Sequence, residues 1–344
     1  MNAAQWDVLT QVIEGKAFQP VPVAFLIDSP WLPGWFGVST LEYYASEEVW
    51  FEANLAAVKS FPDVIFLPGF WSEYGMCTEP SAFGCKCIWH DDSLGHPEAV
   101  LNDISQLGRL RMPNVQTDGL LPFVIQRLLR KQRAMEAAGH QIKFAVSRGP
   151  LNISSFLLGA TEFLVGIKTD PAATHQLLGL VSDFIIQWIE HQLRCFGAIE
   201  GILLLDDIMG FLSEPDFRQF VVPYFQRIYR RFNARVNFLH NDTPGLIAAK
   251  YLREMSVHLY NFSSAHGLDE IRTIAGPEVT LLGNLPPLDV MVRGTPDVVR
   301  QAVGRSLDGI TERSRLIFSC GGGVPQGVPT ENIRSCLEAV QQFS

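Results

Sequence analysis

Gly201-Ile-Leu-Leu-Leu-Asp-Asp207 is the stretch that decides the fold, because it is apolar from Ile202 to Leu205 and then ends in two carboxylates. A strand that is apolar at every position is typical of a parallel sheet with helices on both faces. Segments with helical periodicity precede and follow it, at Pro171–Arg194 and Pro215–Arg231. The stretch therefore predicts a strand–helix unit with a polar group at the end of its strand.

The same unit recurs along the whole chain. The strand-like runs are Val21–Ile27, Val64–Leu67, Ile142–Ser147, Gly201–Leu205, Val236–Leu239, Val257–Phe262, Val279–Gly283 and Leu316–Ser319. Further helical patterns lie between them, at Glu47–Lys59, Gly119–Ala138, Gly245–Met255, Leu268–Ala275 and Asp297–Asp308, and Thr330–Gln342 closes the chain. Eight such units favour a closed (β/α)8 barrel over an open doubly wound sheet. We therefore predict an α/β TIM barrel that occupies residues 1–344 as a single domain.

Residues 84–114 interrupt this alternation. The segment contains a short expected strand at Cys87–Trp89, followed by a polar loop with His90, Asp91 and Asp92. We interpret it as an insertion that lies over the barrel mouth. No internal repeat, low-complexity tract or Pro/Gly/Ser-rich linker marks a second domain.

Composition excludes several classes of protein. The chain is 47% hydrophobic and 18% charged, which is enough apolar material for a large core. A net charge of −9, with 27 Lys and Arg spread along the chain, leaves no basic stripe for nucleic acid. The N-terminal residues lack a signal-peptide pattern, and no run reaches the roughly 18 apolar residues of a membrane span, so we expect a cytoplasmic protein. Its six cysteines would stay reduced there and be available as ligands or nucleophiles.

Barrel enzymes carry their catalytic groups on the loops that follow the strands, and this chain is polar at those positions. The residues that follow the predicted strands are Asp28 after the first, Arg148 after the third, Asp206 and Asp207 after the fourth, His240 and Asp242 after the fifth, Ser263 and Ser264 after the sixth, Asn284 after the seventh and Cys320 after the eighth. The second strand is followed by a loop that carries Glu73, Cys77 and Glu79. We expect an active site built from side chains of this set.

His240, Asp242 and Cys320 are the three residues most typical of a metal site. An imidazole, a carboxylate and a thiolate are usable ligands for a tetrahedral zinc ion. Each residue also has a structural role open to it: His240 as a hydrogen-bonded residue of the mouth, Asp242 as a helix N-cap and Cys320 as a small apolar filler. Spacing alone leaves both interpretations open.

Several stretches together resemble a known family. They are Leu158-Gly-Ala-Thr-Glu-Phe-Leu164, Asp206-Asp207, Leu212-Ser-Glu-Pro-Asp-Phe-Arg-Gln-Phe-Val-Val-Pro-Tyr224, Phe238-Leu-His-Asn-Asp242, Gly283-Asn-Leu-Pro-Pro-Leu-Asp289 and Cys320-Gly-Gly-Gly-Val-Pro-Gln-Gly-Val-Pro-Thr-Glu-Asn332. In this order, over nearly the whole chain, they resemble the uroporphyrinogen decarboxylase superfamily, and more closely its branch of cobalamin-dependent methyltransferases. The resemblance implies a TIM barrel that moves a methyl group to or from a corrinoid carried by a partner protein.

The chain departs from the decarboxylases of that superfamily. Resemblance to them requires an Arg-rich motif after the first strand and a Ser-Asp pair after the second, where this chain reads Asp28-Ser-Pro-Trp-Leu-Pro-Gly-Trp35 and Pro68-Gly69. A tetrapyrrole with many carboxylates also needs several cations in its cleft, and the segment Trp31–Trp35 has none. Decarboxylation of a porphyrinogen is therefore disfavoured.

The methyltransferase branch implies a zinc ion, held by an H-x-C pair after the fifth strand, a Cys after the eighth and a loop carboxylate. His240 and Cys320 match those positions, and Asp242 stands where a Cys is usual. Glu79 is the carboxylate that we expect to complete the site, with Glu73 as the second choice. Three further residues are expected beside the cofactor, namely Asn284, Gly321 and Gly322.

The replacement of a thiolate by Asp242 has a chemical consequence. A site with fewer thiolates is harder and is a stronger Lewis acid. It polarises oxygen better than it activates a bound thiol. The sequence therefore favours a substrate with an ether, hydroxyl or carboxylate oxygen.

The leading functional hypothesis is a zinc-dependent methyltransferase. It would move a methyl group between a corrinoid protein and a small substrate, which is a methoxylated or aromatic molecule or a thiol. The substrate is expected to contact Asp28 and an apolar wall formed by Trp31, Trp35, Phe70 and Trp71. These aromatic residues also have an alternative role in packing.

Two alternatives from other classes stay open. One is a metal-free decarboxylase or lyase of a small acid, in which Arg148 binds the carboxylate and Asp206 or Asp207 donates a proton. The other is a binding or sensor barrel without turnover. Metal content discriminates among the three hypotheses.

Overall fold

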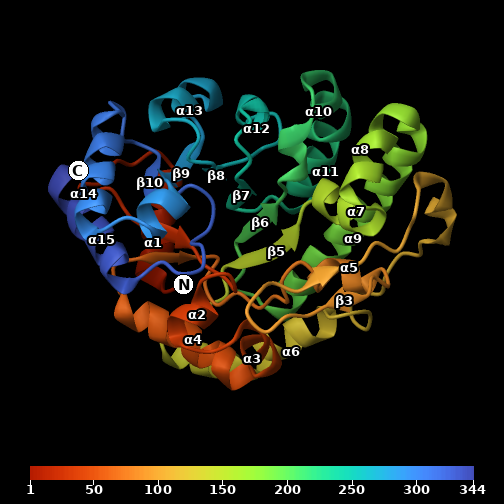
Figure 1. The fold of residues 1–344 in the computed structure, drawn as a ribbon, viewed down its shortest axis with the longest axis horizontal. Coiled ribbons are helices and arrows are strands. Elements are labelled where there is room, and N and C mark those ends of the chain that lie inside the picture. The colour runs from red at the N-terminus through yellow and green to blue at the C-terminus, as the bar shows by residue number, and fades with distance from the viewer.

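The computed structural model describes residues 1–344 and contains the eight parallel strands of a barrel. Six of them form one sheet in the order β10-β9-β8-β7-β6-β5, and β1 pairs in parallel with β2. A bridge between Val23 and Phe318 joins the β1–β2 pair to β10. Helices lie outside the strands on all sides in Figure 1. The prediction of an α/β barrel is confirmed.

All eight predicted strands are present. Their bounds are β1 Ala24–Leu26, β2 Ile65–Leu67, β5 Phe144–Arg148, β6 Gly201–Leu205, β7 Val236–Asn241, β8 Leu259–Phe262, β9 Thr280–Leu285 and β10 Leu316–Cys320. Several strands extend past their predicted ends, so His240, Asn284 and Cys320 lie within strands and not in the loops after them. The position of such a residue in its strand decides to which face its side chain points.

The connections between the strands are mostly helical. The α-helices are α1 Ala3–Ile13, α2 Leu32–Phe36, α3 Thr40–Ala45, α4 Glu47–Ser60, α5 Thr78–Ala82, α6 Leu121–Ala137, α7 Pro150–Leu158, α8 Ala160–Thr169, α9 Pro171–Cys195, α10 Glu214–Phe220, α11 Val222–Phe232, α12 Ile247–Tyr251, α13 Leu268–Ala275, α14 Pro296–Asp308 and α15 Thr330–Phe343. Two short turns, η2 Ile208–Phe211 and η3 Pro287–Val292, follow β6 and β9. No single helix has both the length and the apolar composition to cross a bilayer, and α7 with α8 meets that requirement only as a pair bent by 105°.

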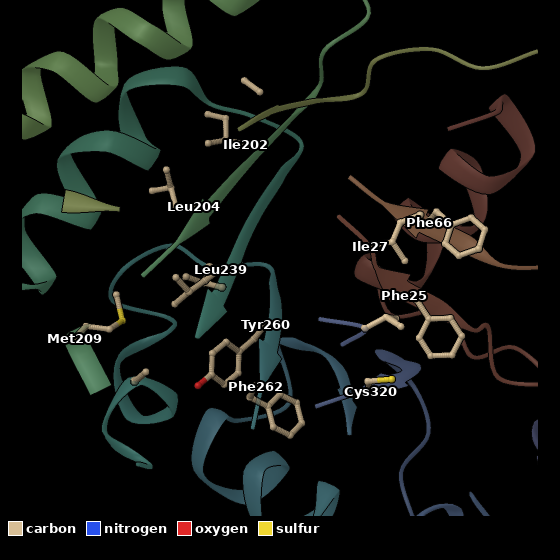
Figure 2. Packing of buried hydrophobic residues seen from close by; sticks show 14 of the residues in the cluster. Phe25, Ile27, Phe66, Ile202, Leu204, Met209, Leu239, Tyr260, Phe262 and Cys320 are labelled. Carbon is tan, nitrogen blue, oxygen red and sulfur yellow. The ribbon is translucent and has the colours of Figure 1, made fainter. Parts of the chain in front are cut away.

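Side chains alternate along each strand between two apolar layers. The inner layer fills the barrel and contains Leu203, Phe238, Leu259, Leu282 and Ile317. The outer layer packs the strands against the helices, and Figure 2 shows part of it, with Leu204, Leu239 and Tyr260. Neighbours along a strand therefore belong to different layers.

Helix α1 closes the N-terminal end of the barrel. Trp6, Leu9 and Val12 of this helix belong to the inner layer, and the Trp6 ring meets Phe144 edge to face at 5.5 Å. The Asn2 side chain accepts a hydrogen bond from the backbone N–H of residue 5 at 2.8 Å, which starts the helix. With this end covered, a ligand reaches the barrel from the C-terminal ends of the strands, where TIM barrels place their sites.

Residues 84–114 form a small element between β2 and β5. The strands β3 Cys87–Ile88 and β4 His96–Pro97 pair antiparallel, and a 3-10 helix, η1, spans Ile104–Arg109. The strand expected at Cys87–Trp89 is thus present and one residue shorter. Leu94, between the two strands, lines a cavity at the C-terminal end of the barrel. At least this residue of the expected insertion reaches the mouth.

Asp206 joins β6 to the start of helix α7. Its carboxylate accepts hydrogen bonds from the N–H groups of Leu151 at 2.8 Å and Asn152 at 3.2 Å. Gly149 precedes this helix because a Cβ there would overlap the Asp206 side chain. Asp206 is fully buried and lies on the same face of its strand as Leu204, away from the barrel axis. Asp206 therefore caps α7, and the proton-donor role that the lyase alternative gave to Asp206 or Asp207 is not needed to explain its burial.

Asp206→Ala is expected to lower the free energy of unfolding by about 1–3 kcal/mol, because two buried N–H groups lose their acceptor. Asp206→Asn keeps one acceptor oxygen and should lose less. Urea denaturation followed by circular dichroism measures the difference. Asp170→Ala is the matched control, since it removes an exposed N-cap from α9 and should cost about 1 kcal/mol. An Asp206→Ala protein as stable as the wild type would contradict the capping role.

Candidate functional site

A cavity of about 260 Å³ lies at the C-terminal ends of the strands. Its polar lining consists of Asp28, Arg148, Asn152, Asp207, His240 and Asp242. Its apolar lining consists of Leu26, Pro30, Trp71, Met76, Leu94, Leu205, Val324 and Pro325. Ligand pockets commonly span roughly 300–1,000 Å³, so this one suits a small molecule.

Asp207, His240 and Asp242 bring three possible metal ligands to the wall of this cavity. One donor atom from each residue lies within 4.8 Å of the other two. His240 Nε2 is 4.0 Å from Asp207 Oδ1, and the Asp242 N–H donates to the same oxygen at 3.1 Å. The expectation placed His240 and Asp242 together, and the structure adds Asp207 to them.

The electrostatics of this cluster favour a cation. Burial raises the pKa of Asp207, and the nearby Asp242 carboxylate also acts to raise it, while His240 acts against both effects. Carboxylates held this close repel one another when both are ionised. A divalent ion between them would remove that repulsion.

Asn261 fixes the orientation of the His240 ring. His240 Nδ1 lies 2.7 Å from Asn261 Oδ1. The Asn261 amide nitrogen donates to the carbonyl oxygens of Leu282 at 2.9 Å and Cys320 at 3.3 Å, so its amide oxygen is the atom that faces the imidazole. Nδ1 therefore carries the proton, and Nε2 presents its lone pair to the cluster. Metal-binding histidines are commonly held by such a partner on the second ring nitrogen.

Cys320 does not reach this cluster. It lies on the same face of β10 as Leu316 and Phe318, in the outer apolar layer, where Figure 2 shows it with Phe25 and Phe262. Burial raises the pKa of its thiol well above the ordinary value, and the nearby Cys336 adds to the shift. A thiol that packs in the layer facing the helices points away from the cluster on the cavity wall. The structure therefore corrects the expected ligand set at this residue.

Gly322 is the residue after β10 that faces the cluster. A Cβ added to it would lie 2.7 Å from Asp242 Oδ2. Its φ of +77° also favours glycine. It lies beside Asp242 of the cluster but supplies no donor atom from a side chain. Gly321 and Asn284 were expected there as well. Gly321 lies against Ser264, and the Asn284 side-chain amide donates a hydrogen bond to the carbonyl oxygen of His266.

Glu79 pairs with Arg148 and not with His240. Its carboxylate accepts hydrogen bonds from the Arg148 backbone N–H at 3.0 Å and from the guanidinium at 3.1 Å. Glu73 lies 3.7 Å from the same guanidinium and accepts a hydrogen bond from the Ser29 hydroxyl. The loop carboxylates, expected to complete the metal site, therefore hold one buried cation.

Trp71 is the one residue of the expected aromatic wall that lines the cavity. Trp31 stacks on Trp35 with ring centroids 4.9 Å apart, and both indole N–H groups donate to the segment 328–330. Phe70 packs in the outer apolar layer. These three residues join parts of the fold, whereas Asp28 lines the cavity.

Sequence reasoning missed Asn261 and Asn152. Asn261 lies in the apolar strand β8, on the same inward face as Leu259. A polar amide at an inward position of an apolar strand is the sequence signal that could have identified it. Asn152 Oδ1 accepts hydrogen bonds from the N–H groups of Asp207 and Ile208, at 3.1 Å each. No local pattern marks Asn152, because its partners lie more than 50 residues away along the chain.

The comparisons with known proteins agree with this barrel. The family model for uroporphyrinogen decarboxylase (URO-D) matches residues 5–343. The chain belongs to this family. Proteins named uroporphyrinogen decarboxylase from Xanthomonas euvesicatoria pv. vesicatoria (strain 85-10) and Azoarcus sp. (strain BH72) are 27% and 24% identical to it. The alignments cover 78% of this chain and 78% and 75% of those proteins.

A solved methyltransferase from Methanosarcina mazei has the same fold as this URO-D family member. The TM-score is 0.81 at 17% sequence identity, with 98% of each chain covered. The family resemblance seen in the sequence is confirmed. Because similar proteins carry the names of two different reactions, the reaction has to be argued from the site.

The residues of the cluster fit a divalent metal ion such as zinc. Zinc accepts imidazole nitrogen and carboxylate oxygen, and its catalytic sites hold three protein ligands and leave one position open. Asp207, His240 and Asp242 provide three such groups beside a cavity. Without a thiolate the site is harder than the one expected from the sequence.

Asn261→Ala is expected to weaken zinc binding about 10- to 100-fold, because His240 loses the partner that selects its tautomer. NMR of protein labelled with ¹⁵N-histidine should show the Nδ1-protonated ring in the wild type and a mixture of tautomers in the variant. Asn237→Ala is the matched control. Asn237 lies in the same strand as His240, and its buried amide donates a hydrogen bond to the Ser256 carbonyl oxygen and not to the His240 ring. Equal zinc affinity of wild type and Asn261→Ala would contradict the assignment.

Proposed function

We propose that this URO-D family member is a metal-dependent methyltransferase that takes a methyl group from an oxygen of a small substrate. The acceptor would be a corrinoid carried by a partner protein, and zinc is the metal that we expect. The cluster of Asp207, His240 and Asp242 on the cavity wall carries the proposal. The likeness to the methyltransferase barrel supports it.

The ligand chemistry favours an oxygen substrate. A bound metal ion would supply Lewis acidity toward a substrate oxygen. One imidazole and two carboxylates donate less charge than thiolates, so a thiol substrate is disfavoured. The chain holds this wall rigidly, because Asn261 orients His240 and Asn152 binds the backbone of Asp207.

Charge argues against porphyrinogen decarboxylation, the reaction in the names of the curated relatives. A substrate with many carboxylates needs several free cations. Arg148 is the one cationic side chain of the cavity lining, and Glu79 and Glu73 already surround it. The lyase alternative is weakened as well, since it relied on a free Arg148, and Asp206, one of its two candidate proton donors, caps α7.

Size supports a separate carrier for the corrinoid. A corrinoid ring is far larger than the small aromatic molecule that a cavity of about 260 Å³ accommodates. It would therefore approach the mouth from outside, held by another protein. The resemblance to the cobalamin-dependent branch implies the same arrangement.

Purified protein is expected to bind about one zinc ion per chain. His240→Ala and Asp207→Ala should each lower zinc affinity about tenfold or more, because each removes one of three ligands. Cys320→Ala is the control and should keep wild-type affinity, since its thiol lies in the outer layer. Elemental analysis and calorimetric titration measure both quantities. Loss of zinc from Cys320→Ala would contradict the ligand set.

Zinc-loaded protein is expected to move the methyl group of 2-methoxyphenol to cob(I)alamin and release catechol. Visible absorbance of the cobalamin and chromatography of the product follow the reaction. Asp207→Ala should be slower by roughly 100-fold or more, because substrate activation loses its metal. Release of carbon dioxide from uroporphyrinogen, with no turnover of any methyl ether, would contradict the proposal.

A further inference from the structure

We propose that Asp28 acts as a hydrogen-bond donor that selects a neutral, largely apolar substrate with an oxygen acceptor. The proposal deepens the function above and rests on it, because it concerns the same cavity. It assigns a role to a carboxyl group that the metal cluster does not use.

Asp28 is the acidic side chain of the cavity that has no partner. It lines the cavity together with Asp207, His240 and Asp242, and no hydrogen bond to the protein stabilises its carboxyl group. Asp28 is half-buried in the cavity wall, and a polar group that loses its water when a ligand binds is unfavourable unless it gains a partner. A ligand in the cavity is the available partner for this one.

The charges around Asp28 favour its protonated form. Arg148 is the one cation nearby, and its guanidinium contacts Glu79 at 3.1 Å and Glu73 at 3.7 Å. Burial raises the pKa of Asp28 well above its ordinary value, the Glu73 charge adds to the shift, and Arg148 opposes it. A protonated carboxyl presents one O–H donor.

The rest of the cavity fits a neutral ligand. A divalent ion would balance Asp207 and Asp242, and Arg148 is already paired with Glu79 and Glu73, so no cationic side chain is free to bind an anionic ligand. The walls are apolar, with Trp71, Met76 and Leu94 among them. An aryl methyl ether has the matching chemistry, since it is neutral, apolar and carries an oxygen acceptor.

Other titratable groups surround the cavity, and a test by pH has to separate them from Asp28. On the side of Asp28 they are Tyr43, Tyr44, Glu73, Glu79 and Arg148, and on the metal side they are Asp207, His240 and Asp242. Asp28→Asn leaves all of these in place. A difference in pH profile between wild type and this variant therefore belongs to Asp28.

The experiment measures binding of three probes of similar size to zinc-loaded protein by calorimetry. The probes are 2-methoxyphenol, 2-methoxybenzoate and phenyltrimethylammonium, which are neutral, anionic and cationic. Wild type should bind the neutral probe most tightly. Asp28→Asn keeps a donor and should bind it as the wild type does, whereas Asp28→Ala should bind it about three- to tenfold more weakly. Binding to wild type should weaken as rising pH ionises Asp28, at pH values below the phenol pKa of about 10, and binding to Asp28→Asn should not weaken over the same range.

Three results would overturn the proposal. One is tightest binding of phenyltrimethylammonium by the wild type with loss in Asp28→Asn, which would make Asp28 an anionic counter-ion. The second is equal binding of 2-methoxyphenol by wild type and Asp28→Ala, and the third is no binding of that probe at all. Zinc content, measured on the same samples, reports separately on the proposed metal site. Circular dichroism verifies that each variant is folded.

Discussion

Side chains of a β-strand point alternately to its two faces, and this constraint decides the chemistry of the barrel. Leu203 points into the barrel and Leu204 toward the helices, and the same rule governs the polar residues at the strand ends. His240 follows the inward residue Phe238 by two positions and therefore reaches the cavity. Cys320 follows the outward residue Phe318 by two positions and therefore packs against the helix layer.

Charge balance is the second organising feature of the site. Acidic groups outnumber cations around the cavity, and Arg148 is shared by two glutamates behind it. The negative charge of the remaining carboxylates is compensated in two different ways. Asp207 and Asp242 lie together, where a divalent cation would compensate their charge, whereas the surroundings of Asp28 favour its neutral, protonated form. Either way, the compensated charges leave a cavity lining that is suited to a neutral molecule.

The sequence was sufficient to predict the strands, because runs such as Gly201–Leu205 carry their own signal. It also placed His240, Asp242 and Asp207 at one end of the barrel. It did not predict the direction of Cys320, because the predicted strand ended one residue early and the alternation was not extended to the thiol. The pairing of Glu79 with Arg148 was not visible either, since it joins residues 69 positions apart.

X-ray absorption spectroscopy of the zinc-loaded protein tests the central claim most directly. If Asp207, His240 and Asp242 hold the metal, the first coordination shell contains only nitrogen and oxygen, at roughly 2.0–2.2 Å. A sulfur scatterer at roughly 2.3 Å would mean that a cysteine binds the zinc. That result would contradict both the ligand set and the preference for an oxygen substrate that follows from it.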